Sequence, residues 1–323
     1  MRKLKVAIAG LGRMGERHVA ALRELAVETI ASAKDSATAK DAASGKDSVP
    51  EIVGYYDPFR SVPYPTLGRF GTFEALCDRS DAVVIASPSE THSYLSTIAL
   101  SMGKVVLVEK PLALSLVEIA TLEKCPNHRT HLWVGQSERF HPLAARARGW
   151  VDAKTALSVE ARRFVPQKKG RTTSPSSLFE LAIHDADLLS FILGAPLSQV
   201  SIREAQGVCI VTCNIGKTEV RIMAGATDGF GERTLLVRTS QETMLFDWLD
   251  KMAIARGAGG NFRSTVSPTS TSPLVDQMRE FLAWADRRER PRRLASFQEA
   301  RDVVCAFLPP SEKKTKAEKL LHA

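Results

Sequence analysis

The N-terminal stretch constrains the fold of this chain more than any other part of the sequence. An apolar run at 4–9 ends in GLGRMG at 10–15, and a helix-forming segment at 16–25 follows directly. In such a strand–turn–helix unit the first glycine permits a tight turn, the second lets a pyrophosphate approach the backbone, and the third lets helix and strand pack closely. The helix N-terminus then presents N–H groups to the phosphates. The predicted cofactor contacts from this loop are Gly10, Gly12, Arg13, Met14 and Gly15.

Strand-like and helix-like segments alternate from residue 4 to residue 136. After the first strand, apolar runs lie at 51–56, 81–86, 105–108 and 130–134. Continuous apolar strands are typical of parallel sheets, and ligands bind at the carboxyl ends of such strands. The sequence therefore predicts a doubly wound α/β Rossmann domain over residues 1–136. The polar or glycine residues at the predicted strand ends are Gly12, Asp57, Ser87, Lys110 and Gln136.

Asp57 follows the second predicted strand, where an acidic residue normally receives the hydroxyls of the adenosine ribose. Its charge would repel a 2′-phosphate and so favours NAD over NADP, although Arg60 could counter this. The spacing from the glycines is about twice the usual ~20 residues, because residues 34–51 contain three six-residue units that each open with Lys-Asp. These units are small, polar and charge-balanced, so we expect a repeat-expanded loop at 28–50 without an indicated function.

After about residue 150 the sequence pattern changes. Apolar and polar residues alternate in short segments at 155–162, 208–215, 219–224, 235–239 and 244–248. This pattern predicts a largely antiparallel sheet with one face in water. We expect helices at 177–193, 274–288 and 296–307, and a loop at 256–273. The sequence thus predicts a second, α+β domain for substrate and oligomer contacts over 137–308, followed by a basic tail at 309–323.

The formal charge of +8 raises the possibility of nucleic-acid binding. The excess, however, lies in the tail and in the arginines at 287–293, where Pro291 interrupts the cluster and no aromatic platform for bases is interleaved. We therefore expect no nucleic-acid partner, although a positive cleft would suit an anionic substrate.

The sequence shows no feature of a membrane protein. No apolar run reaches the roughly 18–20 residues of a membrane span. Because the first predicted strand begins by Leu4, we expect no signal peptide. The five cysteines lack metal-type spacing, so we expect free buried thiols in a reducing cytoplasm and no metal site.

Two segments carry groups suited to proton transfer. In the helix at 177–193, Glu180 and His184 are four residues apart and share a face, about 6 Å apart along the axis. His184 could act as general base with Glu180 orienting it, or the two could form an ordinary surface pair. Lys110 lies between a strand end and Pro111, so its ammonium could hydrogen-bond a substrate hydroxyl and carry its proton, or simply face solvent.

Several stretches of the chain together resemble a known family. They are GLGRMG with RHV after it, SPSETH, VEKPLALS, GQSERFHP and ELAIHDADLL. In their order and spacing they resemble the Gfo/Idh/MocA family of NAD(P)-dependent sugar oxidoreductases, over nearly the whole chain to about residue 308. The resemblance implies hydride transfer between NAD and a secondary alcohol carbon of a sugar, with Lys110 and His184 as the catalytic pair. It also implies that the C-terminal sheet covers the nicotinamide, contacts substrate and forms a homo-oligomer interface. The resemblance implies a cofactor site lined by Ser87, Pro88, His92, Glu109 and Gln136.

Within the family, ERFHP and the arginines before LAIHD look most like nucleotide-sugar 3-dehydrogenases, such as those for UDP-N-acetylglucosamine. Arg139, Arg163 and Arg171 would then contact a diphosphate, which planar guanidiniums suit. A free sugar or a cyclitol such as inositol is the alternative substrate. A sensor that binds NAD without turnover is a further alternative, because the family usually has Asp where this chain has Glu180. The extra methylene could displace the carboxylate by about 1 Å, enough to affect a reacting geometry.

Overall fold

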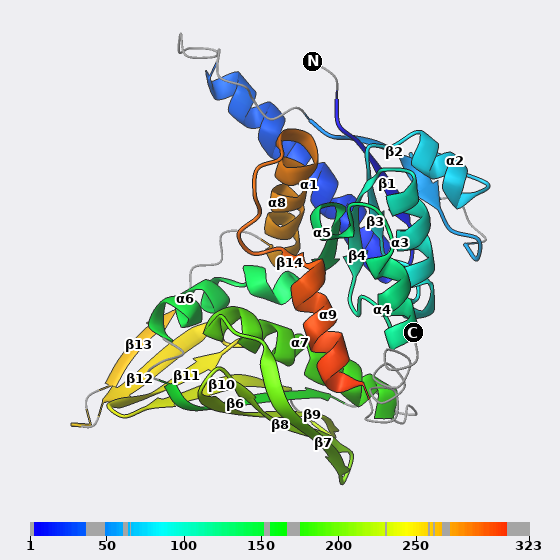
Figure 1. Ribbon diagram of the computed structural model, residues 1–323. Coiled ribbons are helices and arrows are strands. Elements are labelled where there is room, and N and C mark those ends of the chain that lie inside the picture. The colour runs from blue at the N-terminus through cyan, green and yellow to red at the C-terminus, as the bar shows by residue number, and fades with distance from the viewer. Residues whose placement is uncertain are drawn as a thin grey trace. The chain divides into compact units, whose positions relative to one another are not determined.

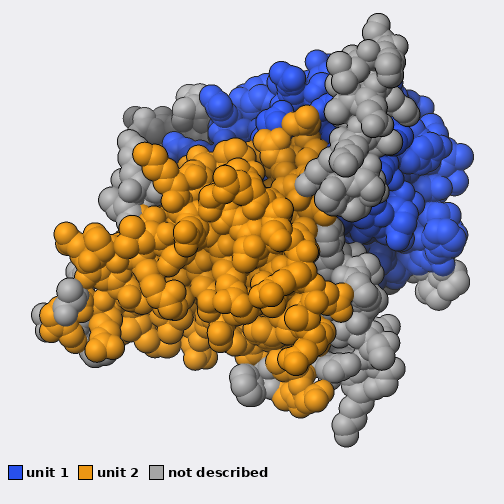
Figure 2. Space-filling view, turned by 60° about the horizontal axis from the view of Figure 1, so that its bottom comes forward, with its two compact units in different colours: residues 1–137, 271–298 blue, residues 138–270, 299–323 orange. Residues whose placement is uncertain are grey.

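The structure is a computed structural model, and it divides the chain into two compact units. It describes residues 3–36, 49–60, 64, 66–151, 156–166, 175–229, 231–257, 259–260, 262–266 and 272–308. Unit 1 comprises residues 1–137 and 271–298, and unit 2 comprises residues 138–270 and 299–323 (Figure 2). The Lys-Asp repeats beyond Ser36 and the predicted tail at 309–323 lie outside the described residues.

Unit 1 is built on a six-stranded sheet with the order β14-β5-β4-β3-β1-β2 (Figure 1). The strands are β1 Lys5–Ala9, β2 Glu51–Tyr56, β3 Ala82–Ile85, β4 Val105–Glu109, β5 Leu132–Gly135 and β14 Ala295–Ser296. All neighbours are parallel except β14, which is antiparallel to β5. Every residue of β3 is buried, as a strand covered on both faces requires. The strand order reverses between β1 and β3, which is where open α/β sheets bind their ligands.

The helices of unit 1 follow the strands in the alternation expected for a doubly wound domain. They are α1 Arg13–Ser36, α2 Phe73–Asp78, α3 His92–Ser101, α4 Leu116–Glu123, α5 His128–His131 and α8 Pro273–Arg287, with the 3-10 turn η1 at Ser89–Thr91. Side-chain caps fix two of the starts, because Thr72 accepts a hydrogen bond from the Ala75 amide and Ser115 accepts one from the Glu118 amide. The predicted doubly wound, parallel Rossmann fold is confirmed by this topology.

Unit 2 is built on an eight-stranded sheet with the order β13-β12-β11-β10-β6-β9-β8-β7. The strands are β6 Ala156–Pro166, β7 Leu197–Ala205, β8 Val208–Ile215, β9 Thr218–Thr227, β10 Glu232–Thr239, β11 Glu242–Asp247, β12 Met252–Gly257 and β13 Phe262–Val266. Among the described strands of unit 2, only β6 and β9 pair in parallel, so the predicted, largely antiparallel sheet is confirmed.

Helix α7, Pro175–Leu193, lies against one face of the unit 2 sheet and contacts β8 and β9 (Figure 1). Its apolar side chains form a core with alternate residues of the strands, such as Val211 and Ile222. Helices α6, Pro142–Trp150, and α9, Phe297–Phe307, complete this core, and the 3-10 turn η2, Ser137–Phe140, precedes α6. The other face of these strands carries the exposed positions, including Thr212 and Arg221.

The structure departs from two sequence-based expectations. Residues 262–266 form β13 inside the predicted loop 256–273, because backbone hydrogen bonds to β12 compensate for a composition that favours turns. Residues 271–298 group with unit 1 rather than with the predicted second domain, since α8 packs on α1 and β14 extends the parallel sheet.

None of the five cysteines forms a disulfide, and four of them are buried. Among the described residues, no helix is both long enough and apolar enough to cross a membrane.

Candidate active site

The glycine loop lies at the carboxyl end of β1, beside the point where the strand order reverses. Gly10 has φ +84°, and a Cβ added there would lie 2.5 Å from the Ser87 backbone. A Cβ on Gly15 would lie 2.0 Å from the Gly10 carbonyl oxygen, so helix α1 approaches the loop as closely as its backbone allows. A Cβ on Gly12 would meet nothing within 4 Å. The loop therefore leaves open space in front of Gly12, where a pyrophosphate would approach.

The first turn of α1 begins at the loop. Arg13 is exposed and Met14 is half-buried. Because the N-terminus of a helix favours anions, these positions fit the phosphates of a dinucleotide.

Asp57, directly after β2, connects the loop to the ribose side of the predicted site. Its Oδ2 accepts a hydrogen bond from the Leu11 amide at 2.8 Å, and its Oδ1 accepts from the Phe59 and Arg60 amides at 3.0 and 3.1 Å. The Arg60 guanidinium donates to the Leu11 carbonyl oxygen at 2.6 Å and to Glu16 at 3.0 Å. The backbone thus fixes the acidic group beside the glycine loop, and Arg60 is already engaged there.

The residues after β3 form a compact hydrogen-bonded turn. The Ser87 and Thr91 hydroxyls are 2.6 Å apart, and Thr91 also donates to the Pro88 carbonyl oxygen at 2.7 Å. His92 is only 1% exposed, and its ring nitrogens lie 3.0 Å from the Ser87 carbonyl oxygen and 2.8 Å from that of Pro111. This places His92 beneath the turn, whereas Ser87 and the exposed Pro88 remain at its surface.

The ends of β4 and β5 carry three more of the predicted residues. Glu109 and Gly135 are cross-strand partners, Lys110 follows Glu109, and Gln136 follows Gly135. Gln136 is 3% exposed, and its Oε1 has no hydrogen-bond partner within the described part of the chain. A buried acceptor in need of a donor fits a site that a ligand completes. The sheet of unit 1 thus brings the predicted glycines, Asp57, Ser87, Lys110 and Gln136 to one edge.

The second predicted catalytic residue belongs to unit 2, on helix α7. His184 is half-buried, and the next residue, Asp185, is held by two hydrogen bonds from Arg163 on β6, at 2.7 and 2.8 Å. The side chain of Glu180, one turn earlier, lies outside the described residues. Lys110 belongs to unit 1 and His184 to unit 2, so their convergence on one substrate stays a prediction.

A carboxylate that sequence reasoning did not select influences His184. Glu138 in η2 accepts hydrogen bonds from Arg163, at 3.4 Å, and from Arg233 on β10. Burial by itself would raise the pKa of Glu138, but the charges of Arg233, Arg163 and His184 lower that pKa to about 2. Glu138 is therefore an anion in the electrostatic field of His184. Glu138 lies within the GQSERFHP stretch, but its partners Arg163 and Arg233 come from segments distant in the sequence, so their assembly around it has no local signal.

The arginines predicted to contact a diphosphate have partners within the protein. Arg139 is 1% exposed and makes two hydrogen bonds to Asp187, at 2.7 and 2.8 Å, and one to Glu299 at 2.9 Å. Arg163 is 8% exposed and is paired with Asp185. Buried guanidiniums with complete carboxylate pairs hold elements of unit 2 together, so we do not assign them to the substrate. Arg171 lies outside the described residues.

The fold and the glycine loop define a Rossmann protein that binds a dinucleotide, and comparison with known proteins agrees. A model of the Gfo/Idh/MocA oxidoreductase family, with an NAD-binding Rossmann fold, matches residues 4–136. The chain is 29% identical over 206 residues to scyllo-inositol 2-dehydrogenase (NAD(+)) of Bacillus subtilis, covering 62% of this chain and 56% of that protein. It is 32% identical over 144 residues to UDP-N-acetylglucosamine 3-dehydrogenase of Acidithiobacillus ferrooxidans, covering 44% of each. In these alignments the chain spans about half the length of the curated relatives it matches.

A solved structure extends the likeness of the fold to the whole chain. UDP-N-acetylglucosamine 3-dehydrogenase GnnA from Acidithiobacillus ferrooxidans superposes with a TM-score of 0.77 and 19% identity, covering 95% of this chain and 96% of that one. The Rossmann domain, residues 4–136, matches the Gfo/Idh/MocA family of NAD-binding oxidoreductases. The predicted family, fold class and cofactor NAD are confirmed.

Proposed function

We propose that this chain is an NAD-dependent dehydrogenase that oxidises a secondary alcohol carbon of a sugar or cyclitol. The observation that carries this proposal is the position of Lys110 at the same sheet edge as the open glycine loop and as Gln136, whose buried Oε1 has no hydrogen-bond partner among the described residues. A lysine at that edge lies where a substrate bound beside the dinucleotide would present its hydroxyl. The named dehydrogenases among the relatives support this class of reaction.

In this proposal the protein holds the cofactor and moves a proton. The loop at 10–15 and Asp57 bind the dinucleotide, which supplies the hydride acceptor when it is bound. Lys110 hydrogen-bonds the substrate hydroxyl and orients it, and His184 takes the hydroxyl proton as general base. Glu138 favours the protonated form of His184 once that proton has arrived. Acid–base assistance of this kind contributes about 10²–10⁴-fold to the rate.

For the substrate we propose a nucleotide-linked sugar, as in UDP-N-acetylglucosamine 3-dehydrogenase among the relatives. A free cyclitol or sugar is the second candidate, and a specific observation favours it. Arg139 and Arg163 are engaged in ion pairs within the protein, so neither guanidinium is available to bind a diphosphate. An uncharged polyol does not require such a cation. The similarity to scyllo-inositol 2-dehydrogenase points the same way.

The test is NADH formation, followed at its absorbance wavelength, with UDP-sugars, inositols and free hexoses offered separately. Lys110→Ala should abolish most turnover but still bind NADH. Lys104→Ala is a matched control, because Lys104 precedes the same strand and its ammonium donates to the Ser80 carbonyl oxygen at 2.9 Å. Absence of NADH formation with every substrate would instead support the non-catalytic NAD-binding sensor.

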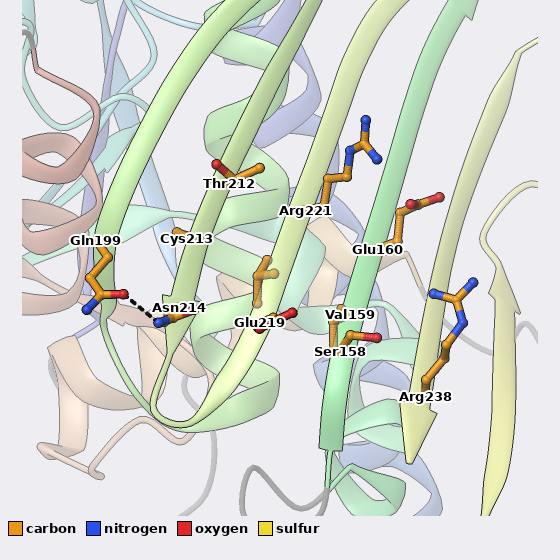
Figure 3. Close-up of a pocket in the computed structure, with 11 residues that line it drawn as sticks. Ser158, Val159, Glu160, Gln199, Thr212, Cys213, Asn214, Glu219, Arg221 and Arg238 are labelled. Atoms are coloured by element: carbon orange, nitrogen blue, oxygen red, sulfur yellow. Dashed lines mark hydrogen bonds between the residues drawn. The ribbon is translucent and has the colours of Figure 1, made fainter. Parts of the chain in front are cut away.

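We further propose that copies of the chain associate through the outer face of the unit 2 sheet. Glu160, Glu219, Arg221 and Arg238 line a hollow of about 520 Å³ on this face, together with Thr212 and with Asn214, which donates to Gln199 at 2.7 Å (Figure 3). A surface that carries both signs of charge can complement itself across a two-fold axis. Light scattering should show an oligomer, and Arg221→Glu with Arg238→Glu should dissociate it. A monomeric wild type would refute this proposal.

The free thiols also support the proposed location of the protein. None of the five cysteines forms a disulfide, and burial raises the pKa of Cys77 to about 12. Unpaired buried cysteines suit a reducing compartment, so we propose the cytoplasm.

A further inference from the structure

The residues immediately before and after Lys110 each make a hydrogen-bond contact with a buried histidine. His18 on α1 is fully buried, and its Nε2 lies 2.7 Å from Oε1 of Glu109, the residue before Lys110. His92 at the start of α3 places its Nδ1 2.8 Å from the carbonyl oxygen of Pro111, the residue after Lys110. Two different helices thus fix the two neighbours of one lysine.

In the contact between His18 and Glu109, the imidazole is the hydrogen-bond donor and the carboxylate is the acceptor. The Glu109 carboxylate lies over Gly135, where an added Cβ would come within 3.0 Å of its Oε1, so a glycine makes room for it. The other nitrogen of His18, Nδ1, has no hydrogen-bond partner among the described residues. An orphaned buried N–H is rarer than an orphaned acceptor, so His18 serves as an Nε2–H donor to the carboxylate. Its position on α1 therefore ties Glu109 to the helix that begins at the glycine loop.

The contacts of His92 join two turns. Its Nε2 lies 3.0 Å from the carbonyl oxygen of Ser87, whose backbone borders Gly10, and its Nδ1 contacts Pro111. The glycine loop is therefore connected to the Lys110 turn by two separate routes, one through each imidazole. Burial of polar rings has a desolvation cost that an apolar side chain at the same site would not have, so packing alone does not account for the two histidines.

We propose that His18 and His92 are positioning residues that hold the Glu109–Lys110–Pro111 turn in register with the dinucleotide loop. His18 acts through Glu109 and His92 through Pro111, and neither contacts the reacting atoms. This inference rests on the proposed role of Lys110 in catalysis. It assigns a function to the histidines of the RHV and SPSETH motifs that differs from direct contact with the cofactor.

For His18 the test compares two substitutions at one position. In His18→Gln the amide nitrogen replaces Nε2 as the donor to Glu109, whereas His18→Leu removes the donor. Since a displacement of about 1 Å can cost 10²-fold in rate, we expect kcat to fall about 10–100-fold in His18→Leu and to stay within about threefold in His18→Gln. The Kd for NADH, measured by its fluorescence, should stay within about threefold of wild type in both variants, because the effect falls on positioning rather than binding.

For His92 the two ring nitrogens can be tested separately. Because a neutral imidazole carries one N–H, it donates to only one of the two carbonyl oxygens at a time. His92→Asn offers a donor near the position of Nδ1 to Pro111, whereas His92→Gln offers a donor near Nε2 to Ser87. We expect His92→Asn to retain the higher kcat. His128→Gln is the matched control, because this histidine also contacts a backbone carbonyl oxygen, that of Cys125 at 2.9 Å, at the opposite edge of the sheet.

The outcomes distinguish this inference from the proposed function. Equal loss of kcat in His18→Gln and His18→Leu, or no advantage of His92→Asn over His92→Gln, would overturn it. So would variants that lower only the melting temperature, or that weaken NADH binding at unchanged kcat. Unchanged turnover in Lys110→Ala would overturn the proposed function instead. If His18→Leu fails to fold, the comparison of His92→Asn with His92→Gln still decides the inference, because both of these variants keep a polar donor.

Discussion

Two glycines of the nucleotide loop should respond to the same substitution in opposite ways. An alanine Cβ at Gly15 would lie 2.0 Å from the Gly10 carbonyl oxygen, and neither backbone can yield cheaply. An alanine Cβ at Gly12 would meet nothing within 4 Å, and Gly12 is not among the glycines with positive φ. Gly15→Ala therefore tests the packing of the loop, and Gly12→Ala tests the space in front of it.

The expected effects on stability follow from these contacts. Overpacking costs about 1–3 kcal/mol and more where backbone must move, so Gly15→Ala should lower the melting temperature by about 5–10 °C. In Gly12→Ala the loss of glycine entropy in the unfolded chain, worth about 0.4–1 kcal/mol, offsets a poorer N-cap for α1, worth about 1 kcal/mol. The melting temperature of Gly12→Ala should therefore stay within about 3 °C of wild type.

For cofactor binding we expect the larger effect in Gly12→Ala, the variant that changes stability least. A methyl group on Gly12 would hold the pyrophosphate away from the loop and weaken charge-assisted hydrogen bonds, each worth about 1.5–3 kcal/mol. Gly12→Ala should raise the Kd for NADH at least about tenfold, as measured by fluorescence titration of the folded protein. Gly149→Ala, at a site on α6 where a Cβ also meets nothing within 4 Å, is the control. Wild-type affinity in Gly12→Ala would refute the placement of the pyrophosphate.

Four further outcomes are expected. Lys110→Ala should reduce kcat by about 10²–10⁴-fold with little change in the Kd for NADH; a parallel loss of both would contradict its assigned role. Arg139→Met should destabilise the protein by about 3–5 kcal/mol, because Asp187 is left buried without its partner, as denaturant unfolding would measure. The pKa of Glu138 is lowered from 4.5 to about 2, so its carboxylate stabilises the fold above its ordinary pKa. That contribution, at most about 3 kcal/mol, should be lost as the pH falls from about 5 to about 2, and melting curves of Glu138→Gln should lack this component. Asp57→Asn should lower the preference for NADH over NADPH by about 1–4 kcal/mol in binding; an unchanged ratio of the two Kd values would argue against charge repulsion.

The sequence predicted best those strands whose apolar residues form a continuous or regularly alternating pattern. The apolar runs at 51–56 and 208–215 coincide with β2 and β8 residue for residue. By contrast, β7 is exposed along most of its length and has little apolar pattern to reveal it. β13 lies in a segment whose composition favours turns, and it forms by hydrogen bonding to a neighbouring strand. Whether β7 and β13 form strands depends on pairing with neighbouring strands, which the local sequence does not reveal.

The candidate site likewise contains residues that the sequence could predict and residues that it could not. The residues at the ends of parallel strands were predictable, because such strands bring their carboxyl ends to one edge of the sheet. The environment of His184 was not predictable, since Glu138 and Arg233 are 95 residues apart. Arg139 was expected to bind substrate, but its partners Asp187 and Glu299 lie 48 and 160 residues away and occupy its guanidinium. An arginine in a motif looks the same in sequence whether its partner is a ligand or the protein.

The buried arginines bear directly on the choice of substrate. A nucleotide sugar brings a diphosphate whose charge must be met by cations when it leaves water. Arg139 and Arg163 are bonded to Asp187 and Asp185, and freeing either would leave a buried carboxylate unpaired, at a cost of about 3–5 kcal/mol. That cost exceeds what one charge-assisted hydrogen bond to a phosphate returns, about 1.5–3 kcal/mol. A diphosphate would therefore have to be held by other cations or by backbone N–H groups, and its binding would then weaken with added salt. A cyclitol carries no charge that must be bound by cations, so its KM should not depend on ionic strength. Measuring KM against ionic strength therefore distinguishes the two substrates.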